Sequence, residues 1–259
     1  MRLRFATLLL GAALPLASHA ADDPLLTAGQ LRTAAQRIAK LILQAPLDGE
    51  PGRVDNKLKQ QMESVRQALE QFATPAFARA RPATLERTRR HWDNLLALGS
   101  SGSPGNVDAP GLLAEQASLA SGKLAMEMTQ QRGLDPRAQL ADLALRQGML
   151  AQRMARLYLL GRSGGAAGGV GVDWEQTRRE YLAASQSLRE AAPGVAGLKG
   201  RLDLADTQWI FFEQAMARAT QGGRPLPQDS AHVASTSDRI VEAMGEAAQL
   251  LLAVRSPGP

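Results

Sequence analysis

The sequence predicts an all-α protein, built as two tandem antiparallel four-helix bundles that are related by internal duplication. Aromatic residues make up only 4% of the chain, whereas β-rich domains draw heavily on Tyr, Trp and branched residues. Apolar residues recur at spacings of three and four, without the alternation typical of strands. A segment near the N-terminus also repeats 116 residues later. These three observations favour helices throughout and two copies of one helical unit.

Residues 1–20 are expected to be a cleaved secretory signal peptide. Arg2 and Arg4 form a basic start, residues 5–16 are a short apolar stretch, and small residues stand at the −3 and −1 positions of a cleavage site after Ala20. The alternative is an uncleaved membrane anchor, but the apolar stretch falls short of the roughly 20 residues that span a bilayer. The mature protein is therefore expected in the periplasm.

Eight amphipathic stretches predict the helices of the mature chain. Their expected ranges are 28–45, 54–73, 84–98, 110–132, 136–162, 173–191, 196–220 and 230–254.

The helix boundaries of the first half follow from capping and turn residues. Thr27 and Gln30 form a capping-box pattern at the start of the first helix, and the second helix stops near Pro75. The Ser, Gly, Pro and Asn residues of 99–108 predict a surface loop before the fourth helix, which ends at Gly133.

The second half restarts at Asp135 and Pro136, an N-cap followed by proline at the first helical position. The glycine-rich stretch 164–172 is expected to be a connector, since it lacks the lysine and the preceding strand of a phosphate-binding loop. Asp173 and Gln176 then form a second capping pattern.

The repeat is clearest in the first helix of each half. Ala28–Leu43 aligns with Ala144–Leu159 at seven identical positions of sixteen. Trp92 aligns with Trp209 at an offset of 117 residues. We expect these two tryptophans to be equivalent core anchors, in preference to ligand-stacking residues.

A third match, Ala117-Ser118 with Ala234-Ser235, has the same offset of 117 residues. The predicted organisation is therefore a first bundle over residues 21–133 and a second over residues 134–259. We expect the two bundles to form an intramolecular pseudo-dimer, with a homodimer of the whole chain as the alternative.

The repeated segment resembles a known family. The residues from Arg146 to Leu159, RQGMLAQRMARLYL, are similar to the first helix of the N-terminal sensor domain of type IV pilus methyl-accepting chemotaxis transducers, the PilJ/NarX-type domain. The first copy retains the pattern at Ala28, Gly29, Arg32, Gln36, Arg37, Lys40 and Leu41.

This resemblance implies an extracytoplasmic helical sensor. In the nitrate- and nitrite-responsive histidine kinases of the family, an arginine of this helix binds the anion across a symmetric interface of two such helices. Arg32 fills that position in the first copy, with Ala28, Gly29 and Gln36 on the same edge of the helix, and Gly148 takes its place in the second copy. The resemblance therefore implies a ligand site for a small anion around Arg32.

The helical period gives an independent interpretation of the same residues. Leu31 and Ile38 belong to the expected core stripe, and Arg32 lies beside it. Arg32 can present its donors to an oxyanion, or it can reach water or pair with a carboxylate between the bundles. Arg37 and Arg153 point about 140° away from Arg32 and its counterpart, so they are expected to be structural ion-pair partners.

The remaining composition argues against catalysis and against nucleic acid binding. The chain has no cysteine, and His91 and His232 show no metal-ligand spacing, so no metal or cofactor is expected. The net charge of +5 comes from basic residues mixed with acidic ones, without a basic run interleaved with aromatics. No catalytic motif is present in the sequence, and we do not expect an enzyme.

The expected function is that of a soluble periplasmic sensor or ligand-binding module. Its ligand would be a small anion, of the nitrate or nitrite kind, and its output would need a membrane sensor or transducer protein as partner. The alternative is a non-catalytic adaptor or structural protein of the cell envelope that has lost ligand binding.

Overall fold

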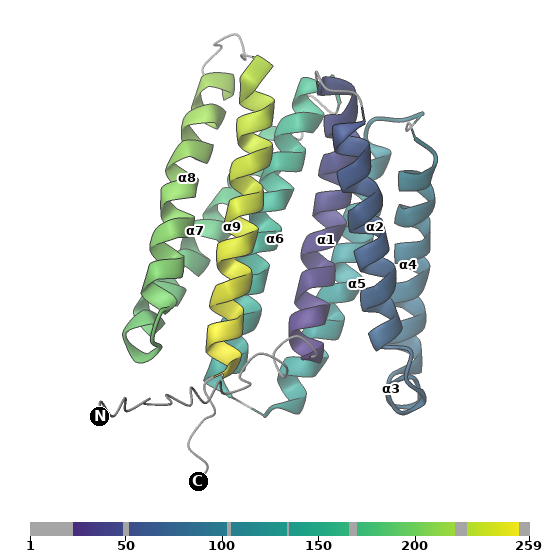
Figure 1. Cartoon of the computed structure of the whole chain (residues 1–259), viewed down its shortest axis with the longest axis vertical. Helices are drawn as coiled ribbons and strands as arrows, with labels where there is room; N and C mark the ends of the chain where they lie inside the picture. The colour runs from purple at the N-terminus through teal and green to yellow at the C-terminus, as the bar shows by residue number, and fades with distance from the viewer. Residues whose placement is uncertain are drawn as a thin grey trace, which may run out of the picture.

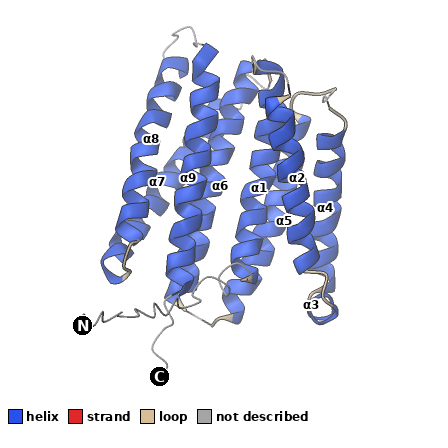
Figure 2. Cartoon of the chain, viewed as in Figure 1, coloured by secondary structure: helices blue, strands red, loops and turns tan. Residues whose placement is uncertain are grey.

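A computed structural model describes residues 23–48, 52–102, 105–133, 135–165, 170–220 and 227–253, with side chains of 217–220 and 227–228 not described. These residues form nine α-helices and two short 3-10 turns, and no strand occurs among them (Figure 2). The helices are α1 Pro24–Gln44, α2 Arg53–Gln71, α3 Pro75–Ala80, α4 Pro82–Ser100, α5 Ala109–Gln131, α6 Pro136–Arg162, α7 Val170–Ala191, α8 Leu198–Thr220 and α9 Pro227–Ala253. The all-α prediction is confirmed. The expected signal peptide, residues 1–20, lies outside the described residues.

All eight expected helices are present, but the expected capping box of the first is wrong. Helix α1 begins at Pro24, and the Asp23 side chain accepts a hydrogen bond from the Leu25 backbone N–H at 2.9 Å. Thr27 lies inside the helix, because the pair Asp23-Pro24 supplies an N-cap and a first residue with a fixed φ. Helix α6 begins with the same pair of residue types at Asp135, as expected.

Two other boundaries differ from expectation. Helix α7 begins at Val170, so Asp173 lies in its first turn rather than at its cap. The short helix α3 occupies a segment expected to be a break, and Thr74 caps it by accepting a hydrogen bond from the Phe77 backbone N–H. The expected stop at Gly133 is confirmed, with a positive φ of 67° that favours glycine.

The helices run up and down side by side, and each of the eight long helices is antiparallel to the next one along the chain (Figure 1). Helices α1, α2, α4 and α5 lie together on one side of the molecule, and α6 to α9 lie together on the other. Helices α1 and α6 lie in the middle and pack against each other.

Buried apolar residues form two clusters that largely follow this division. Trp92 on α4 belongs to the cluster of the first half, is fully buried, and donates from its indole N–H to Ser121 Oγ at 3.0 Å. Trp209 on α8 belongs to the other cluster and stacks on Tyr181, with ring centroids 4.2 Å apart. Both tryptophans are core residues.

The third sequence match is out of register in the structure. Ser118 is buried and donates a hydrogen bond to the Arg32 backbone oxygen, whereas Ser235 is exposed and bonds only within its own helix. Burial instead matches at an offset of 116 residues, where Ser121 and Ser237 are both fully buried. A two-residue match was too short to define the register.

Helix α1 is buried on nearly every side, because it lies between the two groups of helices. Only Pro24, Gln30 and Arg37 among its residues escape burial. The stripe of Leu31 and Ile38 is indeed buried, but so is the opposite face, which carries polar groups. Those polar groups must find partners inside the protein.

Candidate functional site

Helices α1 and α6 meet in parallel, and we call their contact, with the side chains it involves on α5 and α9, the seam. Thr33 Oγ1 lies 3.3 Å from the Leu145 backbone oxygen, and further along both helices Gln36 meets Arg156. A Cβ at Gly29 would lie 2.5 Å from Leu145 Cδ1, so glycine permits the close approach of the helices here. The seam therefore brings the matching segments of the two halves together.

The structure places Arg32 on the α5 side of the seam, in an ion pair. Its Nη2 lies 2.8 Å from Asp142 Oδ1 and 3.0 Å from the Asp142 backbone oxygen, and only 7% of the residue is exposed. Burial lowers the pKa of Arg32, and the adjacent Asp142 carboxylate opposes this shift. The Arg32 guanidinium is thus already paired with the Asp142 carboxylate. This agrees with the expectation that Arg32 pairs with a carboxylate between the bundles and not with the expectation that it binds a free oxyanion.

The other residues of the expected ligand edge are also buried and packed. Ala28 and Gln36 are fully buried, and Gly29 lies against Leu145. The Gln36 Oε1 accepts a hydrogen bond from Arg156 Nε at 2.9 Å. Arg32 and Gln36 are therefore bound to different partners on α6 and do not converge on one open pocket.

A group of polar side chains lies where α1 and α6 meet α9. This α9-side cluster consists of Arg37, Lys40, Gln152 and Asp238. The Asp238 Oδ1 lies 2.7 Å from Lys40 Nζ, 3.3 Å from Arg37 Nε and 3.0 Å from Gln152 Nε2. Two cations thus share one carboxylate, which leaves the cluster with a surplus positive charge.

Lys40 is fully buried within this cluster. Besides Asp238, its ammonium donates to the Ala234 backbone oxygen and to Ser237 Oγ, each at 3.2 Å. Burial lowers its pKa to about 8, although Asp238 opposes the shift. Burial alone would raise the pKa of Asp238, but Lys40 and Arg37 outweigh burial and lower it.

A second group of similar composition lies on the opposite side of the seam. This α5-side cluster consists of Gln36, Glu115, Arg153 and Arg156. The Glu115 Oε1 lies 2.6 Å from Arg156 Nη2 and 2.9 Å from Arg153 Nε, so again two cations share one carboxylate. In each cluster the carboxylate comes from the last helix of the other half.

The sequence repeat supplies most of both clusters. Arg37 matches Arg153, and both form ion pairs, as expected. Sequence reasoning missed Lys40 and its counterpart Arg156 as buried cations. Their conservative match at the repeat spacing was a usable indication. The carboxylates Glu115 and Asp238 occupy different register positions on their helices, so the repeat could not identify them.

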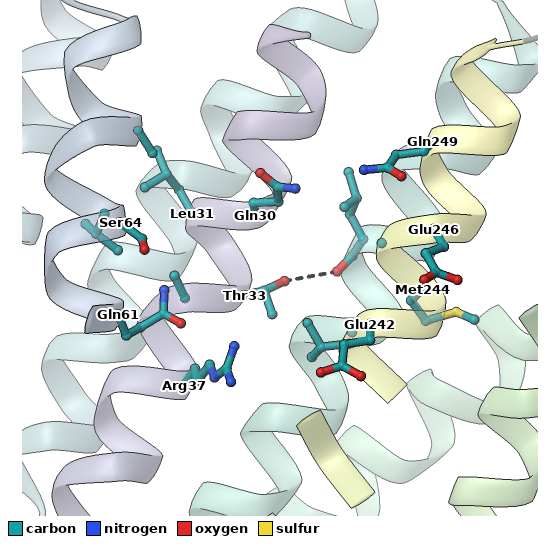
Figure 3. A pocket seen from close by; sticks show the side chains of 17 residues that line it. Gln30, Leu31, Thr33, Arg37, Gln61, Ser64, Glu242, Met244, Glu246 and Gln249 are labelled. Atoms are coloured by element: carbon teal, nitrogen blue, oxygen red, sulfur yellow. Dashed lines mark hydrogen bonds between the residues drawn. The ribbon is translucent and has the colours of Figure 1, made fainter. Parts of the chain in front are cut away.

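A groove of about 400 Å³ lies over the seam on the α9 side. Residues of α1, α2 and α9 line it, together with Leu145 and Gly148 of α6; Figure 3 shows the labelled side chains of α1 and α9 on opposite sides of it. Figure 3 shows Arg37 and Glu242 pointing toward each other from opposite walls. We call this feature the α9-side groove.

Gly148 and Arg32 do not face each other, although the repeat makes them equivalent. A Cβ at Gly148 would point toward α9, 3.5 Å from the Val241 Cα, whereas the Arg32 side chain lies against Gly122 of α5 and Asp142. The structure therefore places the two positions on opposite sides of the seam.

The described residues contain no group of three or more potential metal ligands. None of the helices in the described part of the chain is long and apolar enough to cross a membrane. A scan of protein-family models, a search of curated proteins and a search of solved structures found no match to this chain.

Proposed function

We propose that the chain is an exported sensor module of the PilJ/NarX type, whose two halves arose by duplication and pack as an intramolecular pseudo-dimer. It binds a small ligand between its halves and acts through a membrane partner. The observation that carries the proposal is the seam, where two apolar cores meet through buried ion pairs.

The duplication has support from burial as well as from sequence. At the repeat spacing of 116 residues, Ser121 and Ser237 are both fully buried, and so are the apolar residues Leu124 and Ile240 three positions later. The two first helices also contact each other in parallel, as equivalent helices related by a twofold axis along their length would. A duplicated gene that replaces a homodimer accounts for both observations.

A polar seam suits a sensor better than a purely structural contact. Buried ion pairs contribute little net stability compared with well-packed apolar groups, but they fix the register of the elements that they join. A ligand in the α9-side groove would contact α1 and α2 of one half and α6 and α9 of the other. Ligand binding would therefore favour one relative position of the halves over others, as signalling requires.

The test is a thermal-shift panel of nitrate, nitrite, other oxyanions and small metabolites on the mature protein. A ligand that binds the folded state raises the melting temperature by mass action. Anion binding at Arg32 predicts a shift that disappears in Arg32→Ala and persists in Arg178→Ala, whose ion pair with Glu213 lies away from the seam. A flat response to the whole panel at millimolar concentrations would reject anion sensing through Arg32.

An exposed apolar stripe on α5 favours the second candidate, an envelope adaptor without a ligand. Leu112, Leu119 and Met126 are 62%, 78% and 48% exposed and follow one another every seven residues on one helix face. Such a face is typical of a surface that docks another helix. A photo-crosslinking residue at Leu119 should then capture one defined partner in cells, whereas the same residue at the exposed Lys199 should not.

A further inference from the structure

The α9-side groove combines an apolar base with opposite charges on its walls. Leu145, Gly148 and Met244 are among the apolar residues that line it, and Arg37 and Glu242 face each other across the opening (Figure 3). A pocket of about 400 Å³ accommodates a small metabolite. The inference below rests on the proposed sensor function and names the ligand class for it.

The wall formed by α1 carries a positive charge that the protein only half neutralises. Arg37 reaches Asp238 at 3.3 Å, but Lys40 holds the same carboxylate oxygen at the shorter distance of 2.7 Å. The Arg37 side chain is also 32% exposed, in contrast to the fully buried Lys40. Its guanidinium can therefore accept a carboxylate from a ligand in the groove.

The wall formed by α9 carries a carboxylate that is free to bind a cation. Among the residues that the structure describes, Glu242 forms no ion pair. Its neighbour Glu246, one turn further along α9, pairs with Arg201 at 2.7 Å. Glu242 and Arg37 lie beyond ion-pair distance of each other, so the space between them can hold a ligand with both charges.

We propose that the α9-side groove binds an α-amino acid with an apolar side chain. Its carboxylate pairs with Arg37, its ammonium group pairs with Glu242, and its side chain lies over Leu145, Gly148 and Met244. An α-amino acid carries both charges in one small molecule, which suits two opposite charges that face each other across the groove. A simple anion would leave Glu242 unpaired, and a simple amine would leave Arg37 with only its longer contact to Asp238.

The opposite side of the seam explains why one groove of this kind is open. At the position equivalent to Gly148, the Arg32 side chain runs along the seam to Asp142 and is only 7% exposed. On the α9 side Gly148 has no side chain to extend into the groove that it lines, and Val241 of α9 lies 3.5 Å from the place a Cβ would take. The two matching positions thus differ, with a buried ion pair at Arg32 and a groove beside Gly148.

The primary test is calorimetric titration and thermal shift of the mature protein with L-leucine, L-valine, L-methionine and L-phenylalanine. The best of these should raise the melting temperature by about 5–10 °C at a concentration one hundred times its Kd. Isoamylamine lacks the carboxylate of leucine, and isocaproate lacks its ammonium group. Each analogue should bind about 10- to 100-fold more weakly, since each loses one charge-assisted contact.

Two variants place the ligand in the groove. Arg37→Gln and Glu242→Gln should each weaken amino acid binding about 10- to 100-fold. The matched control is Arg153→Gln, which removes the repeat-equivalent arginine and its ion pair with Glu115 on the other side of the seam, and should bind as the wild type does. Circular dichroism of each variant shows that a loss of binding is not a loss of fold.

The outcomes separate this inference from the proposed function. A flat response to all four amino acids, or binding that Arg37→Gln and Glu242→Gln leave unchanged, overturns the inference. If nitrate or another oxyanion then stabilises the protein through Arg32, the sensor function stands with a different site. If neither panel produces a response, the inference and the sensor function both fail.

Discussion

The two sides of the α1–α6 seam are built from equivalent sequence positions but end in different states. On the α5 side the Arg32 side chain pairs with Asp142 and fills the available space. On the α9 side Gly148 stands at the equivalent position, and a groove of about 400 Å³ remains. The comparison teaches that two positions that match in the sequence repeat can have different surroundings, because Arg32 pairs with Asp142 whereas Gly148 borders a groove.

The two polar clusters differ in a related way. On the α9 side, Asp238 has a side chain that is 17% exposed and holds the fully buried Lys40. On the α5 side, Glu115 has a side chain that is 39% exposed and holds Arg156, an arginine in place of the lysine. The carboxylate and the buried cation of the α9-side cluster are therefore less exposed than their counterparts, and Lys40 is the cation whose pKa burial lowers to about 8.

The largest expected effect comes from removing the carboxylate of the α9-side cluster. Asp238→Asn leaves the buried Lys40 without its counter-charge, and the free energy of unfolding should fall by about 3–5 kcal/mol. Urea denaturation measures the loss. Glu115→Gln is the matched variant on the α5 side and should cost about 1 kcal/mol, because Glu115 is more exposed. Equal losses in the two variants would contradict the difference in burial.

The second effect is a pH dependence confined to the α9 side. Lys40 titrates at about 8 in the folded protein, against an ordinary value of 10.5. Between these pH values the unfolded chain binds more protons than the folded chain, so the free energy of unfolding rises with pH. Relative to Lys40→Arg, which copies the chemistry of the other cluster, the wild type should gain about 2 kcal/mol between pH 8 and pH 10.

Urea denaturation of both proteins across this pH range isolates the contribution of Lys40, because other titrating groups cancel in the difference. Lys40→Met provides a second reference that carries no charge at all. A constant difference across the range would show that Lys40 does not change protonation there.

A smaller effect tests how closely α1 and α6 approach. In Gly29→Ala the new Cβ would lie 2.5 Å from Leu145 Cδ1 and 2.9 Å from Leu145 Cβ. Overpacking of this kind should lower the free energy of unfolding by about 1–3 kcal/mol, measured by urea denaturation. Leu145→Ala in the same background should recover part of the loss. An unchanged stability in Gly29→Ala would mean that the helices are further apart.

The smallest effect has the opposite sign. In Gly148→Ala the nearest atom to the new Cβ would be the Val241 Cα at 3.5 Å, which is ordinary van der Waals contact. Alanine is the better helix former, so the free energy of unfolding should rise by about 0.5–1 kcal/mol. A loss of stability, measured in the same way, would show that the α9 side is as tightly packed as the contact at Gly29.

Much of the fold was predictable from local sequence. The 3.6-residue periodicity identified all eight long helices, since each must bury an apolar face, and Gly133 and Asp135-Pro136 correctly marked the end of α5 and the start of α6. The start of α1 was misplaced because Thr27 and Gln30 fit a capping box as well as Asp23-Pro24 fits an N-cap. Two adequate local patterns compete there, and the tertiary structure decides between them.

The candidate site was less predictable. The repeat identified Arg32, Arg37 and Arg153 as candidate residues but not their partners. The partner of Arg32, for example, is Asp142, which lies 110 residues further along the chain. No local pattern reveals which carboxylate a buried arginine will meet. The groove beside Gly148 could not be predicted from the sequence either, because it depends on how α9 packs against α6 and not on the sequence of either helix alone.

The polar seam also constrains the order in which the protein assembles. Its ion pairs join residues separated by 110 positions for Arg32 and Asp142 and by 198 for Lys40 and Asp238, so they form only after both halves of the chain are available. A chain that ends before these partners would leave Arg32 and Lys40 of α1 without their carboxylates. Those charges disfavour premature association of unfinished chains, which a purely apolar face would promote.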